Sequence, residues 1–383
     1  MNQQIRVLVV DDTVIYRKIL KDVISEMENT EVIGTAPNGE LALRKIEVDR
    51  PDLVLLDVEM PVKDGLETLQ EIKKNYPEIG VIMVSGVNER QASITMEALQ
   101  KGAIDFVPKP SGNNIETNIQ SLKQSLFPII SLFLTRKTIA GVKSGRPQVT
   151  APSISISKPR EPLFSQPSSL QKDKPAISTP VSFAPLPKKV DVLVIGISTG
   201  GPNALAKFVP QIPSDLGVPV LLVQHMPPMF TKSLANHLSM KSTIPVMEAE
   251  DGTVIEKNKV YIAPGGKHMI IKKDGQNSVI SVIDTPPVNS CKPSVDVLFD
   301  SIPSVYNGNI LSLIMTGMGS DGMNGVKTLK KTGCYSITQT EDSCVVYGMP
   351  RAVDEAGLSD ESVHLDQMAS RITQLVKNGI TKN

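Results

Sequence analysis

A serine at position 198 lies in a sequence context typical of an activated hydroxyl. Residues 196–200 read Gly-Ile-Ser-Thr-Gly, follow the apolar run 192–197, and precede a helical pattern that starts at about Pro202. The G-x-S-x-G spacing predicts a sharp turn from strand to helix that lifts the hydroxyl clear of the sheet, next to backbone N–H groups. Ser198 is therefore predicted to be a nucleophile or a hydroxyl that faces a ligand.

A nucleophilic serine needs a general base, and the base needs a carboxylate to orient it. His225 is the favoured base among four histidines, because it ends an apolar run expected beside the Ser198 strand, on the same rim of the sheet. A histidine at a strand end is more often structural, so the argument depends on its pairing with Ser198. His237 lies in a helical pattern, His268 lies in a turn and could line the pocket, and His364 has no evident role.

Asp321 is the carboxylate expected to orient His225. It lies in a turn with four glycines, after the apolar run 310–315 and before a helical pattern. An Asp-Gly pair more commonly forms a turn or a helix N-cap. The surrounding glycines, however, indicate close approach of the backbone to a ligand. Asp251 and Asp296 are weaker rivals, and Asp296 falls inside an apparent helix.

A second group of polar residues lies near the start of the chain, at the ends of apolar runs. Asp11 and Asp12 follow the first run, Asp57 ends the third, Ser85 closes the fourth and Lys109 follows the fifth. Ligands bind at the carboxyl ends of open parallel sheets. Three carboxylates converging there would repel one another unless they held a hard cation such as Mg²⁺. A hydroxyl and an ammonium beside them suit a phosphoryl group, so we interpret this group as a phospho-acceptor site rather than a solvated turn.

The elements that must position these residues follow an α/β pattern in both halves of the chain. Residues 1–125 predict a doubly wound (βα)5 domain, and residues 190–378 predict a second α/β domain with a parallel sheet. Between them, residues 138–188 are rich in Pro, Ser, Lys and Gln, and this composition favours a flexible linker. The expected strands are 7–10, 32–36, 53–56, 81–84 and 106–107 in the first domain and 192–197, 218–223, 260–262 and 310–315 in the second.

The amino-acid composition of the chain narrows its possible partners and its expected location. Forty basic and forty acidic residues cancel, and the chain has no Trp, so neither a nucleic-acid partner nor a membrane surface is expected. The three cysteines, Cys291, Cys334 and Cys344, fit free thiols of a reducing compartment rather than disulfides or a zinc site. With no signal peptide and no apolar run long enough to cross a bilayer, the expected location is the cytoplasm.

Two other interpretations of the serine turn are disfavoured. The order Ser, His, Asp differs from the Ser, Asp/Glu, His order of the α/β-hydrolases. A dinucleotide site would need G-x-G-x-x-G and an acidic residue after the next strand, where this chain has Gln224 and His225.

The first domain resembles the response-regulator receiver over nearly all of residues 4–124. The resemblance implies that Asp57 is phosphorylated and that Asp11, Asp12, Asp57 and the backbone carbonyl of Glu59 hold Mg²⁺. It also implies that Ser85 and Lys109 sense the phosphate. Phe106 takes the aromatic switch position, where Tyr is common in other receivers.

The second domain resembles the catalytic domain of the chemotaxis protein-glutamate methylesterases, the CheB family. The resemblance implies Ser198 as nucleophile, His225 as base, Asp321 as orienting acid, the Met318 N–H as oxyanion donor and Thr199 as a supporting residue. Many relatives have His-Arg where this chain has Cys291-Lys292. The matching stretches, in order, are 196–201, 223–227, 261–268, 293–299, 315–322 and 345–351.

The combined resemblance implies phosphorylation-activated hydrolysis of glutamyl γ-methyl esters on chemoreceptors, and deamidation of glutamine at the same site. A chemotaxis histidine kinase would be the phosphodonor, and ester hydrolysis would need no cofactor. Three alternatives stay open at this point: a second domain that only docks a partner, a phospho-regulated transcription factor, and an esterase with a substrate outside chemotaxis. The transcription factor is disfavoured because the second half has an α/β pattern and not a basic helix-turn-helix.

Overall fold

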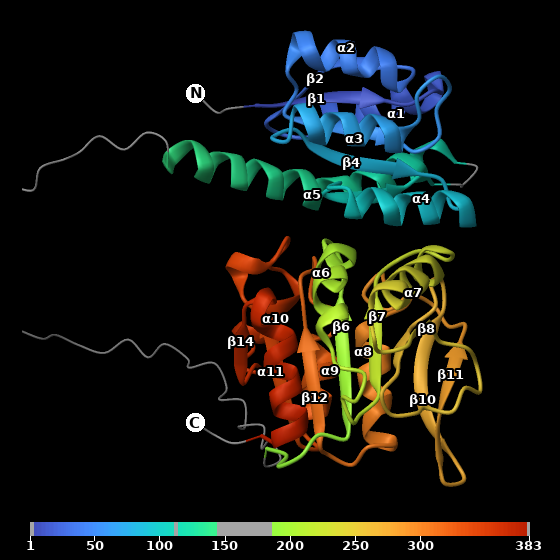
Figure 1. The fold of residues 1–383 in the computed structure, drawn as a ribbon, viewed down its shortest axis with the longest axis vertical. Coiled ribbons are helices and arrows are strands. Elements are labelled where there is room, and N and C mark those ends of the chain that lie inside the picture. Colours follow the sequence, from blue (N-terminus) through green and yellow to red (C-terminus); the bar gives the residue numbers. More distant parts are fainter. Residues whose placement is uncertain (1–3, 111–113, 144–185, 381–383) are drawn as a thin grey trace, which may run out of the picture.

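The computed structural model describes residues 4–110, 114–143 and 186–380, which form two α/β domains packed against each other (Figure 1). The first is a parallel five-stranded sheet in the order β2-β1-β3-β4-β5. Its elements are β1 (Ile5–Val10), α1 (Val14–Ser25), β2 (Thr30–Ala36), α2 (Gly39–Asp49), β3 (Leu53–Asp57), α3 (Gly65–Asn75), β4 (Gly80–Ser85), α4 (Glu89–Gln100), β5 (Asp105–Pro108) and α5 (Ile115–Lys143).

The second domain is a parallel seven-stranded sheet in the order β14-β13-β12-β6-β7-β9-β8, with an antiparallel β10-β11 hairpin beside it. Its strands are β6 (Val192–Ile197), β7 (Val220–Gln224), β8 (Val246–Glu248), β9 (Val260–Ile262), β10 (His268–Asp274), β11 (Asn277–Ile283), β12 (Ile310–Ile314), β13 (Cys334–Gln339) and β14 (Glu361–Val363). The α-helices are α6 (Gly201–Phe208), α7 (Phe230–Lys241), α8 (Val295–Ser301), α9 (Met323–Lys330), α10 (Met349–Glu355) and α11 (Leu365–Asn378). The α/β fold expected for both domains is confirmed.

Every residue of strands β3, β4, β6, β7 and β12 is buried, as expected for central parallel strands covered on both faces by helices. In the second sheet, Ile314 of β12 pairs with Gly196 of β6, and Ile197 pairs with Gln224 of β7. The three strands therefore end level with one another. The chain order reverses at β6, so the loops after these strands surround a crevice at this edge.

Helix α5 differs from the sequence-based expectation. It continues to Lys143, past residue 125, where the first domain was expected to end, and through 138–143, which were assigned to the linker. The apolar side chains of Leu126, Ile129 and Ile130 pack into the core of the first domain, which explains why the helix continues past residue 125. Residues 144–185 of the expected linker lie outside the described residues.

The two domains meet through the α4 and β5 side of the first domain and the α6 and α7 side of the second (Figure 1). Phe106 stacks on Phe230, with ring centroids 4.6 Å apart and planes at 15°. The Asn203 amide donates to the backbone carbonyls of Ala103 and Ile104, both at 3.2 Å. The junction thus combines an aromatic contact with hydrogen bonds to the backbone just before β5.

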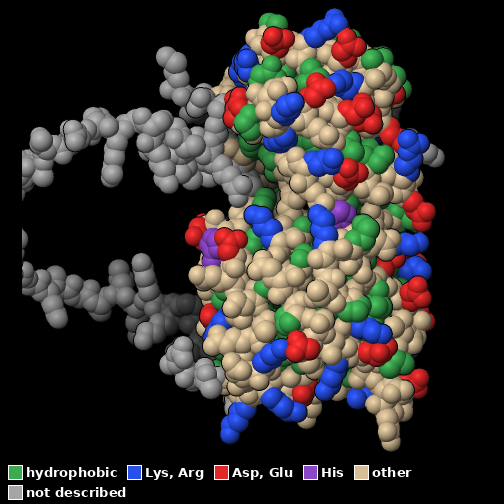
Figure 2. All heavy atoms as spheres, in the orientation of Figure 1, with side chains coloured by type: hydrophobic (Ala, Val, Ile, Leu, Met, Phe, Trp, Pro, Cys, Tyr) green, Lys and Arg blue, Asp and Glu red, His purple; other side chains and the backbone are tan. Residues whose placement is uncertain are grey.

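Figure 2 shows acidic and basic side chains interspersed over the visible face, in keeping with forty charges of each sign. Within the described part of the chain, no helix combines the length and the hydropathy needed to cross a bilayer.

Candidate active site

Ser198 occupies the turn between β6 and α6, as predicted. Its N–H donates to the Thr316 carbonyl at 2.9 Å, and its carbonyl accepts from the N–H of Gly201 at 2.7 Å and from the Gln224 amide at 2.9 Å. Gly200 has a φ of 75°, and a Cβ there would lie 2.4 Å from the Cβ of Val345. The turn therefore requires glycine at this position, which explains the motif.

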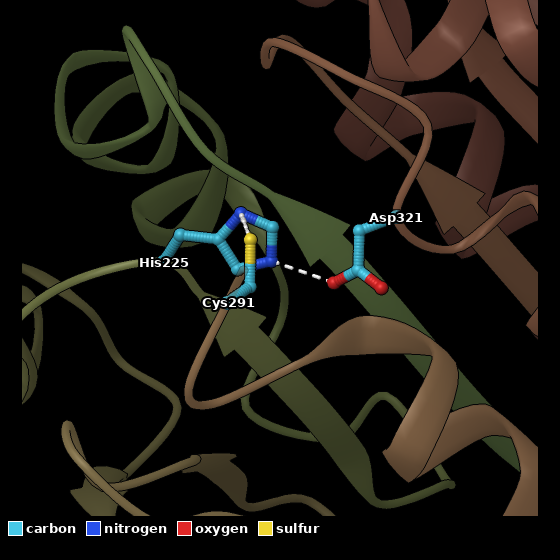
Figure 3. Close-up of side chains that lie close together, drawn as sticks. All are labelled: His225, Cys291 and Asp321. Atoms are coloured by element: carbon cyan, nitrogen blue, oxygen red, sulfur yellow. Dashed lines mark hydrogen bonds and ion pairs between the residues drawn. The ribbon is translucent and has the colours of Figure 1, made fainter. Parts of the chain in front are cut away.

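His225 and Asp321 are brought together across the crevice, from the loops that follow β7 and β12. Figure 3 shows the imidazole directed at the carboxylate, with His225 Nε2 2.8 Å from Asp321 Oδ2. The backbone N–H of His225 donates to the Ile197 carbonyl at 3.1 Å, which fixes the start of the loop after β7 beside the end of β6. Because Nε2 is hydrogen-bonded to the carboxylate, Nδ1 is the ring nitrogen that could exchange a proton with a nucleophile or a substrate.

Asp321 is held by residues that sequence reasoning missed. Its Oδ1 accepts from the Asn289 amide and the Ser294 hydroxyl, both at 2.8 Å, and its Oδ2 accepts from the Val295 N–H at 2.7 Å. Asp296, considered above as a rival, instead accepts from the N–H groups of Gly322 and Gly325 at 2.9 and 2.7 Å. The start of α8 thus fixes both the carboxylate and the turn that carries it.

Cys291 is the second neighbour of the imidazole. Its Sγ lies 3.5 Å from His225 Nδ1, and Figure 3 shows the sulfur in front of the face of the imidazole ring. The sequence placed Cys291 near the site only through its departure from the family pattern. It gave no sign that the sulfur would contact the ring.

The environment of the pair favours an imidazolium–carboxylate arrangement. Burial alone would lower the pKa of His225, but hydrogen bonds to Asp321 and Cys291 raise it to about 9. Burial would raise the pKa of Asp321, yet His225, Asn289 and the Val295 N–H hold it down at about 2. Asp321 therefore stays ionised, and the imidazole gains a proton readily, as a general base must during attack by a hydroxyl.

Ser198, Thr199, His225 and Met318 line one pocket of about 340 Å³ together with Cys291. The Ser198 hydroxyl and the Met318 N–H donate to none of the residues that the structure describes, so both are available to a ligand in the pocket. Receiver residues form the other wall: Asp105, Phe106, Pro108, Gln124, Ser125, Pro128 and Ile129. The pocket therefore lies between the two domains.

The other histidines lie away from this pocket, and the expectation that His268 could line it is wrong. His268 is fully buried, with Nδ1 accepting from the Ser294 N–H and Nε2 3.1 Å from the Pro286 carbonyl, so it supports the loop before α8. His237 lies on α7 and His364 caps α11. Asp251 accepts from the Val282 N–H at 2.8 Å and does not approach His225.

The receiver residues also converge as predicted. Ligand atoms of Asp11, Asp12 and Asp57 lie within 4.8 Å of one another, and Lys109 Nζ lies 2.7 Å from Asp11 Oδ2 and 2.8 Å from Asp57 Oδ2. Burial raises the pKa of Asp57 to about 6, although Lys109 opposes this shift. Three carboxylates at this spacing are an oxygen-ligand set of the kind that Mg²⁺ takes.

The other predicted receiver residues lie on or just after strands β3, β4 and β5. Ser85 ends β4 and its hydroxyl is 2.8 Å from the Thr95 hydroxyl on α4. The Glu59 side chain is turned toward α4, where it accepts from the Gln91 amide at 2.5 Å. Phe106 lies on β5, stacked on Phe230 of the second domain.

A receiver-type α/β domain closed over a serine, histidine and aspartate site defines a two-domain regulated hydrolase class, and comparison with known proteins agrees. Residues 7–120 match the response regulator receiver domain, and residues 193–372 match the CheB methylesterase. A protein-glutamate methylesterase/protein-glutamine glutaminase of Desulfotalea psychrophila is 43% identical over 98% of this chain and 99% of its own. One of Trichodesmium erythraeum is 40% identical over 97% and 99%.

A solved structure of the Thermotoga maritima CheB methylesterase catalytic domain is 37% identical, with a TM-score of 0.48, covering 49% of this chain and all of that one. On the full-length similarity, the chain belongs to the family of protein-glutamate methylesterases/protein-glutamine glutaminases. The resemblance inferred from the motifs is thus confirmed.

Proposed function

We propose that this protein hydrolyses glutamyl γ-methyl esters on chemoreceptors, and deamidates glutamine at the same site, as a step of receptor adaptation in chemotaxis. The family supports the substrate class, and one observation supports the chemistry. His225 is held by Asp321 through Nε2 at 2.8 Å, and it lines the same pocket as Ser198.

In this proposal, Ser198 Oγ attacks the ester carbonyl while His225 Nδ1 takes the hydroxyl proton. The Met318 N–H donates to the oxyanion, and Thr199 supports the turn. Collapse of the tetrahedral intermediate breaks the bond to the methoxy oxygen, and His225 returns the proton to release methanol. Water then attacks the acyl-enzyme by the same route and releases the glutamate side chain. With a glutamine substrate the leaving group is ammonia.

The pH dependence follows from the raised pKa of His225. The base acts only when neutral, so the rate falls as the pH drops below about 9 and a larger share of the imidazole is protonated. Cys291 contributes to that raised pKa through its contact with Nδ1. Replacing Cys291 with alanine should therefore move the acid limb of the rate profile to lower pH.

We further propose that Asp57 is the phosphorylation site and that Asp11, Asp12, Asp57 and the Glu59 carbonyl hold Mg²⁺. When bound, the ion would neutralise charge on the phosphoryl oxygens. Ser85 and Lys109 would contact the phosphoryl group, and Lys109 already lies between Asp11 and Asp57.

Phosphorylation is proposed to activate the enzyme by opening the two domains. The receiver supplies one wall of the Ser198 pocket, where a helical segment of a receptor could not enter while the domains are closed. Phe106 links the phosphorylation site to this wall through its stack on Phe230. Repacking around Phe106 would therefore shift the equilibrium toward the open arrangement. A chemotaxis histidine kinase as phosphodonor and a cytoplasmic location belong to the same proposal.

Methanol release from methyl-labelled receptor membranes, with and without a small-molecule phosphodonor, tests the proposal. Wild-type protein should release methanol faster with phosphodonor, and Ser198→Ala, which removes one oxygen, should release none above background. A fragment that starts near Val190 should exceed the unphosphorylated full chain. Activity retained by Ser198→Ala would overturn the nucleophile, and a fragment no faster than the full chain would overturn the blocking role of the receiver.

A further inference from the structure

Gln224, the last residue of β7, joins the backbones of the nucleophile and the base. Its Nε2 donates to the Ser198 carbonyl at 2.9 Å and to the His225 carbonyl at 3.3 Å. An amide NH₂ group carries two hydrogens, so both bonds form at once. On the basis of the proposed function, in which Ser198 passes its proton to His225, we propose that Gln224 is a positioning residue that sets the spacing of these two residues.

The register of the two strands explains why this side chain reaches both residues. Gln224 pairs with Ile197 across β7 and β6, so each lies one position before a residue of the site. The backbone N–H of His225 then donates to the Ile197 carbonyl at 3.1 Å. The Gln224 amide extends this ladder by one residue, to the carbonyls of Ser198 and His225 themselves, at the point where both chains leave the sheet.

The two ends of the Gln224 amide have different surroundings. Both carbonyls are acceptors, so only the NH₂ end of the side chain can face them. The other end, Oε1, is buried and accepts from none of the residues that the structure describes. An unpaired buried acceptor lowers stability, and an apolar side chain of the same length would avoid that loss. Stability alone therefore does not explain a glutamine at this position.

Gly201, the first residue of α6, leaves free the space that the amide occupies. A Cβ at Gly201 would lie 1.9 Å from Gln224 Oε1. The helical backbone of this residue suits alanine at least as well as glycine, so it is the amide that requires glycine here. The Gly201 N–H also donates to the Ser198 carbonyl at 2.7 Å. The amide of Gln224 therefore packs directly on the turn that carries the nucleophile.

Gln224→Met keeps the length of the side chain but removes its donor. With phosphodonor, the kcat for methanol release by the full chain should fall about 10- to 100-fold at an unchanged KM, because a displacement of about 1 Å at the reacting atoms has an effect of this size. The unfolding temperature measured by calorimetry should stay within about 4 °C of wild type, because removal of the unpaired acceptor offsets the two lost bonds. Gln211→Met, the control at an exposed position after α6, should change neither quantity. A wild-type kcat in Gln224→Met would overturn the proposal, and so would a large drop in its unfolding temperature, since Gln224 would then act only through the stability of the fold.

Gly201→Ala displaces the amide by a second route, because its methyl group takes the place of Gln224 Oε1. Alone, it should lower kcat. In a Gln224→Ala background the space is open, so adding Gly201→Ala should change kcat by less than about twofold. Equal effects of Gly201→Ala in the two backgrounds would overturn the proposed contact. The same pair of variants, compared by unfolding temperature, needs no substrate. Coupling found there in a protein that releases no methanol would contradict the proposed esterase function and leave the contact of Gln224 with the turn standing.

Discussion

Acidification should tighten the closed arrangement of the two domains through Asp105, the first residue of β5. Its Oδ2 accepts from the Gly200 N–H of the nucleophile turn and its Oδ1 from the Phe106 N–H, both at 2.9 Å. The side chain is buried at the domain junction. Burial raises the pKa of Asp105 from 3.8 to about 6, although the two hydrogen bonds act in the opposite direction.

The direction of this pH dependence is set by whether the open or the closed arrangement binds the Asp105 proton more tightly. If opening returns Asp105 to water and to its ordinary pKa of 3.8, the closed state binds the proton more tightly. Closure then strengthens as the pH falls through 6 toward 3.8, and weakens as the pH rises through 6. Between pH 7 and pH 5 these two pKa values change the closure free energy by on the order of 1 kcal/mol, or about tenfold in the open fraction.

The assay compares basal methanol release by full-length wild-type protein and Asp105→Asn, which is uncharged like the protonated acid, from pH 5 to 7.5. The titration of His225 affects both proteins alike, so it cancels in the ratio of the wild-type rate to the Asp105→Asn rate. This ratio should fall about tenfold from pH 7 to pH 5, because protonation of Asp105 makes the wild-type protein as fully closed as the variant. The control Asp22→Asn, at an exposed position on α1, should give a flat ratio. A flat ratio for Asp105→Asn as well would refute the reasoning.

Three further predictions concern the triad and the receiver. Asp321→Asn should reduce methanol release by about 10⁴-fold and Ser198→Ala by about 10⁶-fold, because the nucleophile and the base both remain in Asp321→Asn. Equal losses in the two variants would show that the residues act only as a unit, and no loss would show that Asp321 serves only to form its turn. Asp57→Asn should keep basal activity and ignore phosphodonor, and EDTA should remove the phosphodonor response of wild-type protein; a preserved response in either case would contradict the assigned site. Phe106→Ala should raise the unphosphorylated rate about two- to tenfold, since an aromatic pair contributes about 0.5–1.5 kcal/mol; a lower rate would contradict the role of the Phe230 stack in closure.

The sequence predicted the parts of the site that depend on strand order. Ser198, His225 and Asp321 each follow an apolar strand, and parallel strands that end level bring such residues to one edge. The same reasoning placed Asp57 and Lys109 together in the receiver. These predictions rest on local patterns, which a single sequence carries.

The remaining parts of the site depend on contacts between distant segments, which leave no periodic signal. Asn289 and Ser294 reach Asp321 from about thirty residues earlier in the chain, out of a loop whose composition suggests only a turn. His268 was expected to be able to line the pocket because it was assigned to a turn, yet the fold buries it against the same loop. Nothing in the sequence distinguished Asp105, because its partner Gly200 belongs to the other domain.

The position of Asp105 and Phe106 suggests how one strand can serve both regulation and catalysis. Ser85 ends β4 and is bonded to Thr95 of α4, the helix that packs against α7. If a phosphoryl group on Asp57 draws the Ser85 hydroxyl toward itself, the bond to α4 is lost at the face that holds the second domain. Phe106, on the adjacent strand, stacks on Phe230 at the first residue of α7, and Asp105 next to it holds the Gly200 N–H. Movement at the phosphorylation site would then act on α7 and on the nucleophile turn at once, so release of the receiver and exposure of Ser198 would be one event.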